Sequence, residues 1–285
     1  EAVSFGEYRG DGYAAEKLLV RSEDGIYLPS LLFKPGDAKP AMPVILYVSE
    51  FGKPVDAERP SLALELVRQG HTVFAVDVRG SGETDPRVRA FLAPVTHYDP
   101  PQYQFDSCAV EAAQLKTTML AMQAYDVLRS MDYLAGCEGM GERPVVLVGE
   151  GLGGVWALVA AAFDSRVAGI ACVGTVPSYH LIVDSQYYAV RDYYWVARAL
   201  EDFDIPDLAG LIAPKPVILI DPLDAMLERL EPGQDESFWQ WPAGVYQQLK
   251  TPGHLRFTHT SGGNVRETSQ QVTAILAEVG KNQHQ

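Results

Sequence analysis

The glycine-rich stretch PVVLVGEGLGGVWALVAAAFD, residues 144–164, decides the fold of this chain. Its pattern predicts a buried strand, a tight turn and an apolar helix. Two motifs fit the turn. Gly149, Gly151 and Gly154 match G-x-G-x-x-G, the fingerprint of a dinucleotide-binding turn. Gly149, Gly151 and Gly153 match G-x-S-x-G, the strand-to-helix elbow that presents a nucleophilic serine, with glycine at the serine position.

The composition of the chain limits its partners. It has 285 residues, of which 47% are hydrophobic and 10% aromatic, enough to bury a large core. The formal net charge of −14 argues against nucleic acid or an anionic membrane surface as a partner. No apolar run reaches 18 residues, the length at which a stretch becomes a candidate membrane span. We therefore expect neither a nucleic-acid nor a membrane partner.

The sequence offers little metal or redox chemistry. Its three cysteines, Cys108, Cys137 and Cys172, give no disulfide framework and no C-x-x-C pair. No H-x-x-x-H or H-E-x-x-H pattern is present. We expect no metal site and no cofactor.

Strand and helix patterns alternate along the chain. A hairpin is expected around Asp24 and Gly25, formed by residues 16–25 and 26–36. The further expected strands are 42–50, 71–84 with its glycine turn, 145–149, 167–174, 215–221 and 255–260. The expected helices are 57–70, 112–136, 153–163, 237–250 and 266–280. This order predicts a three-layer α/β fold with a mostly parallel central sheet and an antiparallel N-terminal hairpin.

The chain order distinguishes the two motifs. A dinucleotide fingerprint normally follows the first strand of its sheet, and the next strand ends in an acidic residue that holds the ribose. Here the turn follows roughly the fifth strand, and the next strand, VAGIACVG, ends at Gly174 without a carboxylate. Asp164 comes too early, at the end of the helix. The serine-elbow interpretation is favoured, and nucleotide binding by residues 149–154 is the second alternative.

Four stretches carry a family resemblance: VFAVDVRGSGET (73–84), AYDVLRSMDYLAG (124–136), VVLVGEGLGG (145–154) and IAPKPVILIDPLDAM (212–226). On these, the sequence resembles the α/β-hydrolase superfamily, and within it the acetyl-xylan-esterase and dienelactone-hydrolase-like group. The resemblance implies a three-layer α/β-hydrolase fold with residues 1–285 as a single domain. It also implies that 178–203 is a small cap-like insertion.

The resemblance assigns the nucleophile position to Gly151. Glycine is the residue that adopts positive φ without steric cost, so the elbow can persist after its hydroxyl is lost. Glu150 precedes this position, and its side chain is expected to point away from the direction of the nucleophile.

The same resemblance places the acid and the base of a Ser-His-Asp triad. Asp221 and Asp224 follow the strand that should carry the acid, although both also suit the turn DPLD. The expected histidine position holds Asn264. His259, five residues earlier, is the candidate base, and a structural role for it on the strand stays open.

The oxyanion hole is also unusual. Leu152 and Gly52 are the candidate backbone donors, from the elbow and from the loop after residues 42–50. Glu50 in that loop would place a negative charge where an oxyanion forms, unless its side chain turns away to solvent.

Two insertions, 86–108 and 178–203, are expected at the carboxyl ends of the strands, where open α/β sheets bind ligands. Aromatic side chains with polar groups suit sugar rings. The alternative is that these aromatic side chains pack the cap onto the domain. The candidate ligand-binding residues are Tyr179, Tyr187, Tyr188 and Trp195.

These patterns predict an esterase-like domain without a complete Ser-His-Asp triad, non-catalytic, that binds a carbohydrate or ester ligand. The first alternative is an active serine carboxylester hydrolase whose serine at position 151 has been replaced. The chain begins at Glu1 without a methionine, which fits a part of a larger chain. If this is a processed end, a secreted or periplasmic location is expected. The sequence leaves open whether the chain forms a homo-oligomer.

Overall fold

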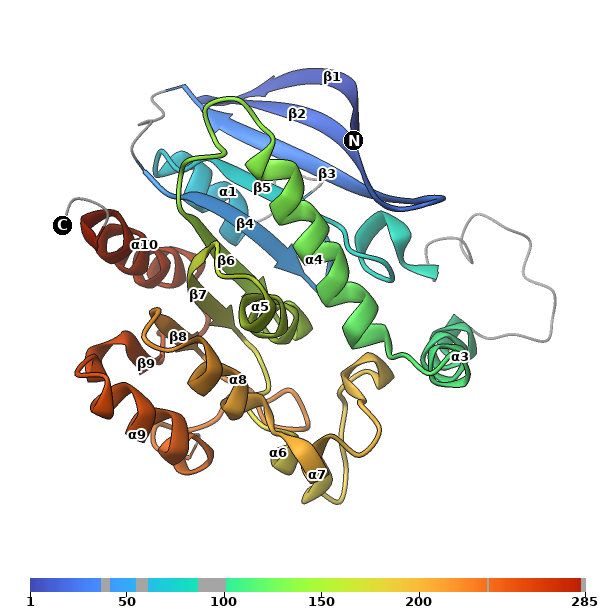
Figure 1. Ribbon diagram of the computed structural model, residues 1–285, viewed down its shortest axis with the longest axis vertical. Coiled ribbons are helices and arrows are strands. Elements are labelled where there is room, and N and C mark those ends of the chain that lie inside the picture. Colours follow the sequence, from blue (N-terminus) through green and yellow to red (C-terminus); the bar gives the residue numbers. More distant parts are fainter. Residues whose placement is uncertain (37–41, 55–60, 87–100, 235, 283–285) are drawn as a thin grey trace.

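The computed structural model describes residues 1–36, 42–54, 61–86, 101–234 and 236–282, and its centre is a nine-stranded sheet within those residues (Figure 1). The strand order is β1-β2-β3-β5-β4-β6-β7-β8-β9. Strands β1 to β3 are antiparallel and β4 to β9 run parallel to one another. The strands are β1 (Ala2–Gly10), β2 (Tyr13–Glu23), β3 (Ile26–Pro35), β4 (Val44–Ser49), β5 (Val73–Val76), β6 (Val145–Glu150), β7 (Val167–Val173), β8 (Val217–Ile220) and β9 (Leu255–Thr258).

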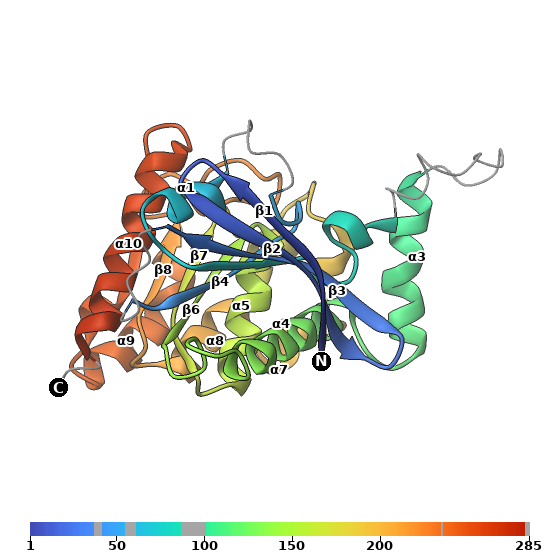
Figure 2. The same ribbon diagram turned by 90° about the horizontal axis from the view of Figure 1, so that it is seen from above.

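Helices cover both faces of the sheet, so the predicted three-layer α/β-hydrolase architecture is confirmed (Figure 2). The helices are α1 (Leu62–Arg68), α3 (Pro101–Gln114), α4 (Met119–Ala135), α5 (Leu152–Phe163), α6 (Tyr179–Val183), α7 (Ala199–Asp202), α8 (Ile205–Ile212), α9 (Gln240–Gln248) and α10 (Val265–Asn282). Short 3₁₀ turns are η1 (Gly82–Thr84), η2 (Asp192–Tyr194), η3 (Glu236–Trp239) and η4 (Pro252–His254).

Two apolar clusters form the core because side chains alternate between the faces of each strand. In β4, Leu46 and Val48 pack with α4, α5 and α8, whereas Ile45 and Tyr47 pack with α1 and α10. The parallel strands β4, β6, β7 and β8 are buried on both faces, which explains their continuous apolar sequences.

The expected helix 112–136 is wrong as a single element, because the structure divides it into α3 and α4. Lys116 has a positive φ of 59°, which ends helical geometry. Thr118 then caps α4, with its hydroxyl accepting a hydrogen bond from the Ala121 N–H at 3.0 Å. Apolar spacing continues across the break, so periodicity alone misses it.

The N-terminal region differs from expectation in one further way. The hairpin is confirmed, with Glu23 opposite Ile26 and Gly25 at φ 77°. Residues 2–10, for which the sequence pattern predicted no element, form β1 against β2. Sequence patterning missed this strand because its residues are exposed on both faces.

The first insertion follows β5 and η1, and the second follows β7, so both begin at the carboxyl ends of strands in the sheet. Residues 87–100 of the first lie outside the described residues. The second, which we call the cap segment (residues 178–203), contains α6, η2 and α7. It leads directly into α8, a helix that the sequence pattern did not predict.

Candidate functional site

The glycine turn has the geometry of a nucleophile elbow. Strand β6 ends at Glu150, and α5 begins at Leu152. Between them Gly151 has φ 61° and ψ −129°, which confirms the predicted positive φ. The packing of strand on helix explains the neighbouring glycines, because a Cβ at Gly149 would lie 2.2 Å from the Gly153 carbonyl oxygen.

Glu50 fills the space in front of this elbow. The residue is 8% exposed, directly after β4, and its Oε2 accepts a hydrogen bond from the Leu152 N–H at 3.2 Å. A Cβ added at Gly151 would lie 2.6 Å from Glu50 Cδ and 2.7 Å from its Cγ. Of the two expected orientations, Glu50 therefore adopts the inward one, and it lies where the side chain of a nucleophile would begin.

The two predicted oxyanion donors are both engaged. The Leu152 N–H is present in the elbow, but the Glu50 carboxylate is its acceptor. The Gly52 N–H donates to the Ser49 carbonyl oxygen at 3.0 Å. A Cβ at Gly52 would lie 2.4 Å from Gly82 Cα, so this glycine serves close packing of two loops. An oxyanion hole requires donors directed at developing negative charge, and here a carboxylate already occupies that position.

The cap segment reaches Glu50. Arg191 donates a hydrogen bond from Nη1 to the Glu50 carbonyl oxygen at 3.4 Å. Tyr193 and Tyr194, which follow in η2, are buried. Burial, and then the negative charge of Glu50, raise the pKa of Tyr194 well above its ordinary value. These contacts place η2 and Arg191 against the residue that fills the elbow.

Glu150 points away from the elbow, as predicted. Its Oε2 accepts hydrogen bonds from the Tyr47 hydroxyl and from Ser49 Oγ, the latter at 3.3 Å. Burial, followed by the charge of Glu150, raises the pKa of Tyr47. Glu150 also lines a cavity of about 200 Å³, which Asp221 and Arg229 line from other parts of the chain.

The two candidate acids have different roles. Asp221 is buried directly after β8, where its carboxylate accepts hydrogen bonds from the Thr260 N–H at 2.7 Å and the Thr260 hydroxyl at 2.6 Å. Asp224 accepts from the N–H groups of Met226 at 2.8 Å and Glu228 at 2.9 Å, as a turn former does. Of the two candidate acids, Asp221 is the one that lines the described part of the cavity beside Glu150. No sequence signal identified its partner Thr260.

Neither Asn264, at the expected histidine position, nor His259, the candidate base, lines the described part of the cavity beside Asp221. Asn264 lies directly before α10, and its Oδ1 accepts from the N–H groups of Arg266 at 2.9 Å and Glu267 at 3.4 Å, as a helix N-cap does. His259 follows the last residue of β9 and is exposed. The described lining of the cavity beside Asp221 and Glu150 contains no histidine.

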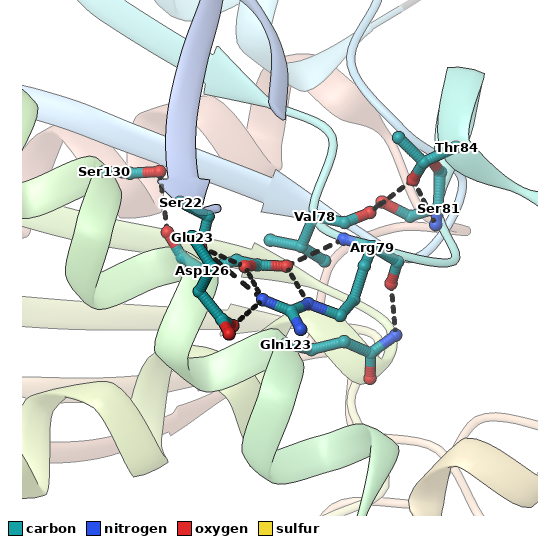
Figure 3. Close-up of polar contacts among 9 residues, drawn as sticks. All are labelled: Ser22, Glu23, Val78, Arg79, Ser81, Thr84, Gln123, Asp126 and Ser130. Atoms are coloured by element: carbon teal, nitrogen blue, oxygen red, sulfur yellow. Dashed lines mark hydrogen bonds and ion pairs between the residues drawn. The ribbon is translucent and has the colours of Figure 1, made fainter. Parts of the chain in front are cut away.

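A buried polar network fixes the loop that packs against this site (Figure 3). Arg79 donates from Nε to Asp126 Oδ2 at 2.8 Å and from Nη2 to Glu23 Oε1 at 2.6 Å. Asp126 also accepts from the Ser22 hydroxyl at 2.6 Å, and Gln123 Nε2 donates to the Arg79 carbonyl oxygen at 2.9 Å. The network joins β2, α4 and the loop after β5, the loop that packs against Gly52. Two of the stretches that carry the family resemblance meet here.

The cap aromatics divide into two kinds. Tyr179 is 3% exposed, whereas Tyr187 and Tyr188 are 68% and 51% exposed. The Trp195 ring contacts the Tyr188 ring edge-to-face, with 5.4 Å between centroids. Tyr179 and Trp195 line a groove of about 680 Å³ between the cap segment and α3–α4. Binding by the four residues stays a prediction.

Two kinds of feature are absent from the described residues. No cluster of three or more histidine, cysteine or acidic side chains there could hold a metal ion. No described helix is both long and apolar enough to cross a membrane.

The comparisons with known proteins agree with this fold. The chain is 22% identical over 201 residues to "Putative hydrolase YtaP" of Bacillus subtilis (strain 168), a match that covers 66% of this chain and 62% of that protein. The structure resembles a "putative acetyl xylan esterase" from Bacteroides fragilis NCTC 9343 with a TM-score of 0.71, 18% identity, and 91% and 70% of the two chains covered. It also resembles a glucuronoyl esterase from Solibacter usitatus, with a TM-score of 0.62 and 16% identity; the match covers 98% of this chain and 86% of that chain.

A family comparison covers most of the sequence. The model of the alpha/beta hydrolase fold matches residues 51–262, which include the elbow, the cap segment and Asp221. This chain belongs to the α/β-hydrolase fold family.

Proposed function

We propose that this chain is a non-catalytic, esterase-like α/β-hydrolase domain that binds a small-molecule or carbohydrate ligand. One observation carries the loss of catalysis: the Glu50 side chain occupies the space of a nucleophile at position 151 and accepts the hydrogen bond of the Leu152 N–H. Hydrolysis through the elbow needs that space for an acyl carbon and that N–H for its oxyanion.

The remaining triad positions support the same conclusion. Asp221 keeps the position of an acid, but Thr260 donates both of its hydrogen bonds to it. Asn264 caps α10 and has no group that can act as a general base at neutral pH. Loss of the serine or the histidine from such a triad costs on the order of 10⁶ in kcat, as in subtilisin. Turnover by this route is therefore expected to be negligible.

Glu50 also argues against nucleotide binding by the turn 149–154. A pyrophosphate would bind the free N–H groups at the N-terminus of α5, where backbone dipoles favour an anion. The Glu50 carboxylate is already the anion at this position, and a phosphate there would meet its charge. We therefore do not propose a nucleotide ligand.

The ligand class is supported by the named relatives and by the cap. Solved structures of similar fold are named "putative acetyl xylan esterase", acetyl xylan esterase and glucuronoyl esterase. The cap segment presents exposed aromatic rings at Tyr187, Tyr188 and Trp195. Rings of this kind stack on the apolar faces of sugars.

The proposal is tested by ester hydrolysis with the intact chain. We expect p-nitrophenyl acetate to be cleaved no faster than in buffer that contains an equal amount of albumin. Saturable turnover that disappears on Asp221→Asn would contradict the proposal and favour an active hydrolase. Turnover that survives this change and Glu50→Gln alike would indicate a contaminating esterase, so both variants are measured from parallel preparations.

A further inference from the structure

The groove between the cap segment and α3–α4 lies apart from the elbow. Its volume of about 680 Å³ is within the range of small-molecule sites. In η2 and the residue after it, Asp192 and Trp195 line the groove, whereas Tyr193 and Tyr194 are buried toward the core. Figure 1 shows α3 beyond the start of α4, beside the cap. A ligand in the groove would therefore not touch Glu50 or Gly151.

Both walls of the groove carry exposed apolar side chains. Val110 on α3 and Val183 at the end of α6 are each 57% exposed, and both line it. Exposed aliphatic side chains on two facing walls favour an apolar ligand, because burying them removes apolar surface from water. The other apolar lining residues include Ala113, Met119, Val196 and Leu200.

The charges of the groove differ from those of the whole chain. The described part of its lining contains two cationic side chains, Lys116 and Arg198, and the carboxylate of Asp192, in a chain whose formal charge is −14. Arg198 is paired with Glu201. Among the described residues, the Lys116 side chain makes no hydrogen bond or ion pair. Its ammonium is thus available to a ligand anion, while the acidic surface elsewhere repels one.

The backbone and a buried hydroxyl add to this pattern. Lys116 and Arg198 have φ of 59° and 65°, a conformation that is uncommon for residues other than glycine and is concentrated at ligand sites. Tyr179 also lines the groove, and its buried hydroxyl has no hydrogen-bond partner among the described residues. A buried hydroxyl without a partner is unfavourable and would be satisfied by a polar atom of a ligand or water.

We propose that this groove binds an amphiphilic anion, with an apolar body between α3 and the cap and a single carboxylate beside Lys116. A medium-chain fatty acid has this chemistry. The proposal specifies the ligand class of the proposed non-catalytic binding domain, and so it rests on the ligand-binding part of that function. It is independent of whether the elbow is catalytic, because none of the groove residues belongs to the elbow.

The direct test is calorimetric titration of the intact chain with decanoate below its micelle concentration. We expect saturable binding of one decanoate per chain. Decyltrimethylammonium, which has the same apolar chain and the opposite charge, should bind at least tenfold more weakly. Xylobiose should not compete with decanoate for the groove. Equal binding of the anion and the cation, or competition by xylobiose, would overturn the proposal.

Two variants locate the site. Ala113→Trp fills the groove from an exposed position and should abolish decanoate binding, with the melting temperature as a check of folding. Lys116→Asn removes the charge but tolerates positive φ, and it should weaken binding about threefold to fivefold, as the loss of an exposed ion pair does. The matched control is Lys250→Asn, because Lys250 also has positive φ (62°) but lies outside the groove.

The outcomes separate the two proposals. If Ala113→Trp leaves decanoate binding unchanged, the groove is not the binding site and the groove proposal is wrong, whatever the result of the esterase assay. Ester turnover that needs Asp221, together with decanoate binding that needs Ala113 and Lys116, would refute the non-catalytic elbow and keep the groove. Absence of both binding and turnover would refute the groove and leave the loss of catalysis in place.

Discussion

Glu50 and Leu152 lie 102 residues apart in the chain, and a hydrogen bond of 3.2 Å joins the carboxylate of one to the backbone N–H of the other. The bond places a negative charge at the N-terminus of α5, where the helix dipole stabilises it. The hydrogen bond requires the lack of a Cβ at Gly151, since a side chain at 151 would displace the carboxylate. The carboxylate of Glu50 thus takes the space that a nucleophile at position 151 would need.

The first prediction concerns this interdependence. Gly151→Ser should lower the free energy of unfolding by about 2 kcal/mol or more, because it adds backbone strain at positive φ and a contact with Glu50. The double variant Glu50→Ala/Gly151→Ser lacks this contact. Its loss of unfolding free energy should therefore be about 1 kcal/mol smaller than the sum of the losses of the two single variants. Urea denaturation monitored by circular dichroism measures all three values.

The control for strain alone is Gly139→Ser. Gly139 has φ 72°, and no atom lies within 4 Å of the position of its Cβ. This substitution should lower the free energy of unfolding through backbone strain alone, and its effect should not depend on Glu50. Strict additivity of the Glu50 and Gly151 changes would show that the predicted contact has no energetic consequence.

The second prediction concerns the network of Figure 3. The side chain of Asp126 is fully buried and pairs with Arg79, which is 15% exposed. Asp126→Ala leaves a mostly buried guanidinium without its main partner and should cost about 3–5 kcal/mol. Lys34→Ala, which breaks an exposed pair with Glu16, should change stability by less than about 1 kcal/mol. Similar melting temperatures for the two variants would contradict the prediction.

The sheet and the elbow could be predicted from sequence because their signals are local. An apolar stretch before Gly149 and another after Gly151 indicate a strand, a turn and a helix within a few residues. The division of α3 from α4 could not be predicted from periodicity, since it depends on the positive φ of Lys116 and the cap at Thr118. Strand β1 was missed because strand pairing, and not burial, holds it.

The site could be predicted only in part, because its contacts are made across the chain. The vacant nucleophile position is a property of one residue, Gly151. The inward orientation of the Glu50 side chain depends on the N–H of Leu152, which begins α5 and lies far along the chain from β4. The choice of Asp221 over Asp224 likewise depends on contacts with the loop after β9 that no local pattern contains.

The third prediction concerns thiol chemistry. Burial raises the pKa of Cys172 to about 12. The thiolate is the reactive form, so at pH 8 only about 10⁻⁴ of this thiol would be ionised, and Cys172 should react with Ellman's reagent only after unfolding. Because the folded pKa lies above the unfolded one, Cys172 favours folding below about pH 9, and this contribution is lost as the pH rises toward 12.

Cys172→Ala provides the control for that measurement. In native protein at pH 8, the variant and the parent should release the same amount of thionitrobenzoate, because the remaining thiols, Cys108 and Cys137, are partly exposed. In denaturant the parent should release one equivalent more. A difference between the two proteins already in the native state would show that Cys172 is accessible and ionised.

The last prediction concerns the substitutions that would give the elbow a complete triad. Gly151→Ser alone should give no turnover of p-nitrophenyl acetate, because the Glu50 carboxylate beside the new hydroxyl still accepts the Leu152 N–H, and no histidine lines the described part of the cavity beside Asp221. Gly151→Ser/Asn264→His adds a base near Asp221 but loses the cap of α10, at about 1 kcal/mol, and keeps the carboxylate in the oxyanion position. Only Glu50→Ala added to this pair should give a burst of p-nitrophenol, measured by stopped flow. Each variant is compared with its counterpart that carries Gly151→Ala, which has no hydroxyl to acylate. Robust, saturable turnover from Gly151→Ser alone would mean that a base, with His259 as the candidate, is already in place and that Glu50 yields to substrate.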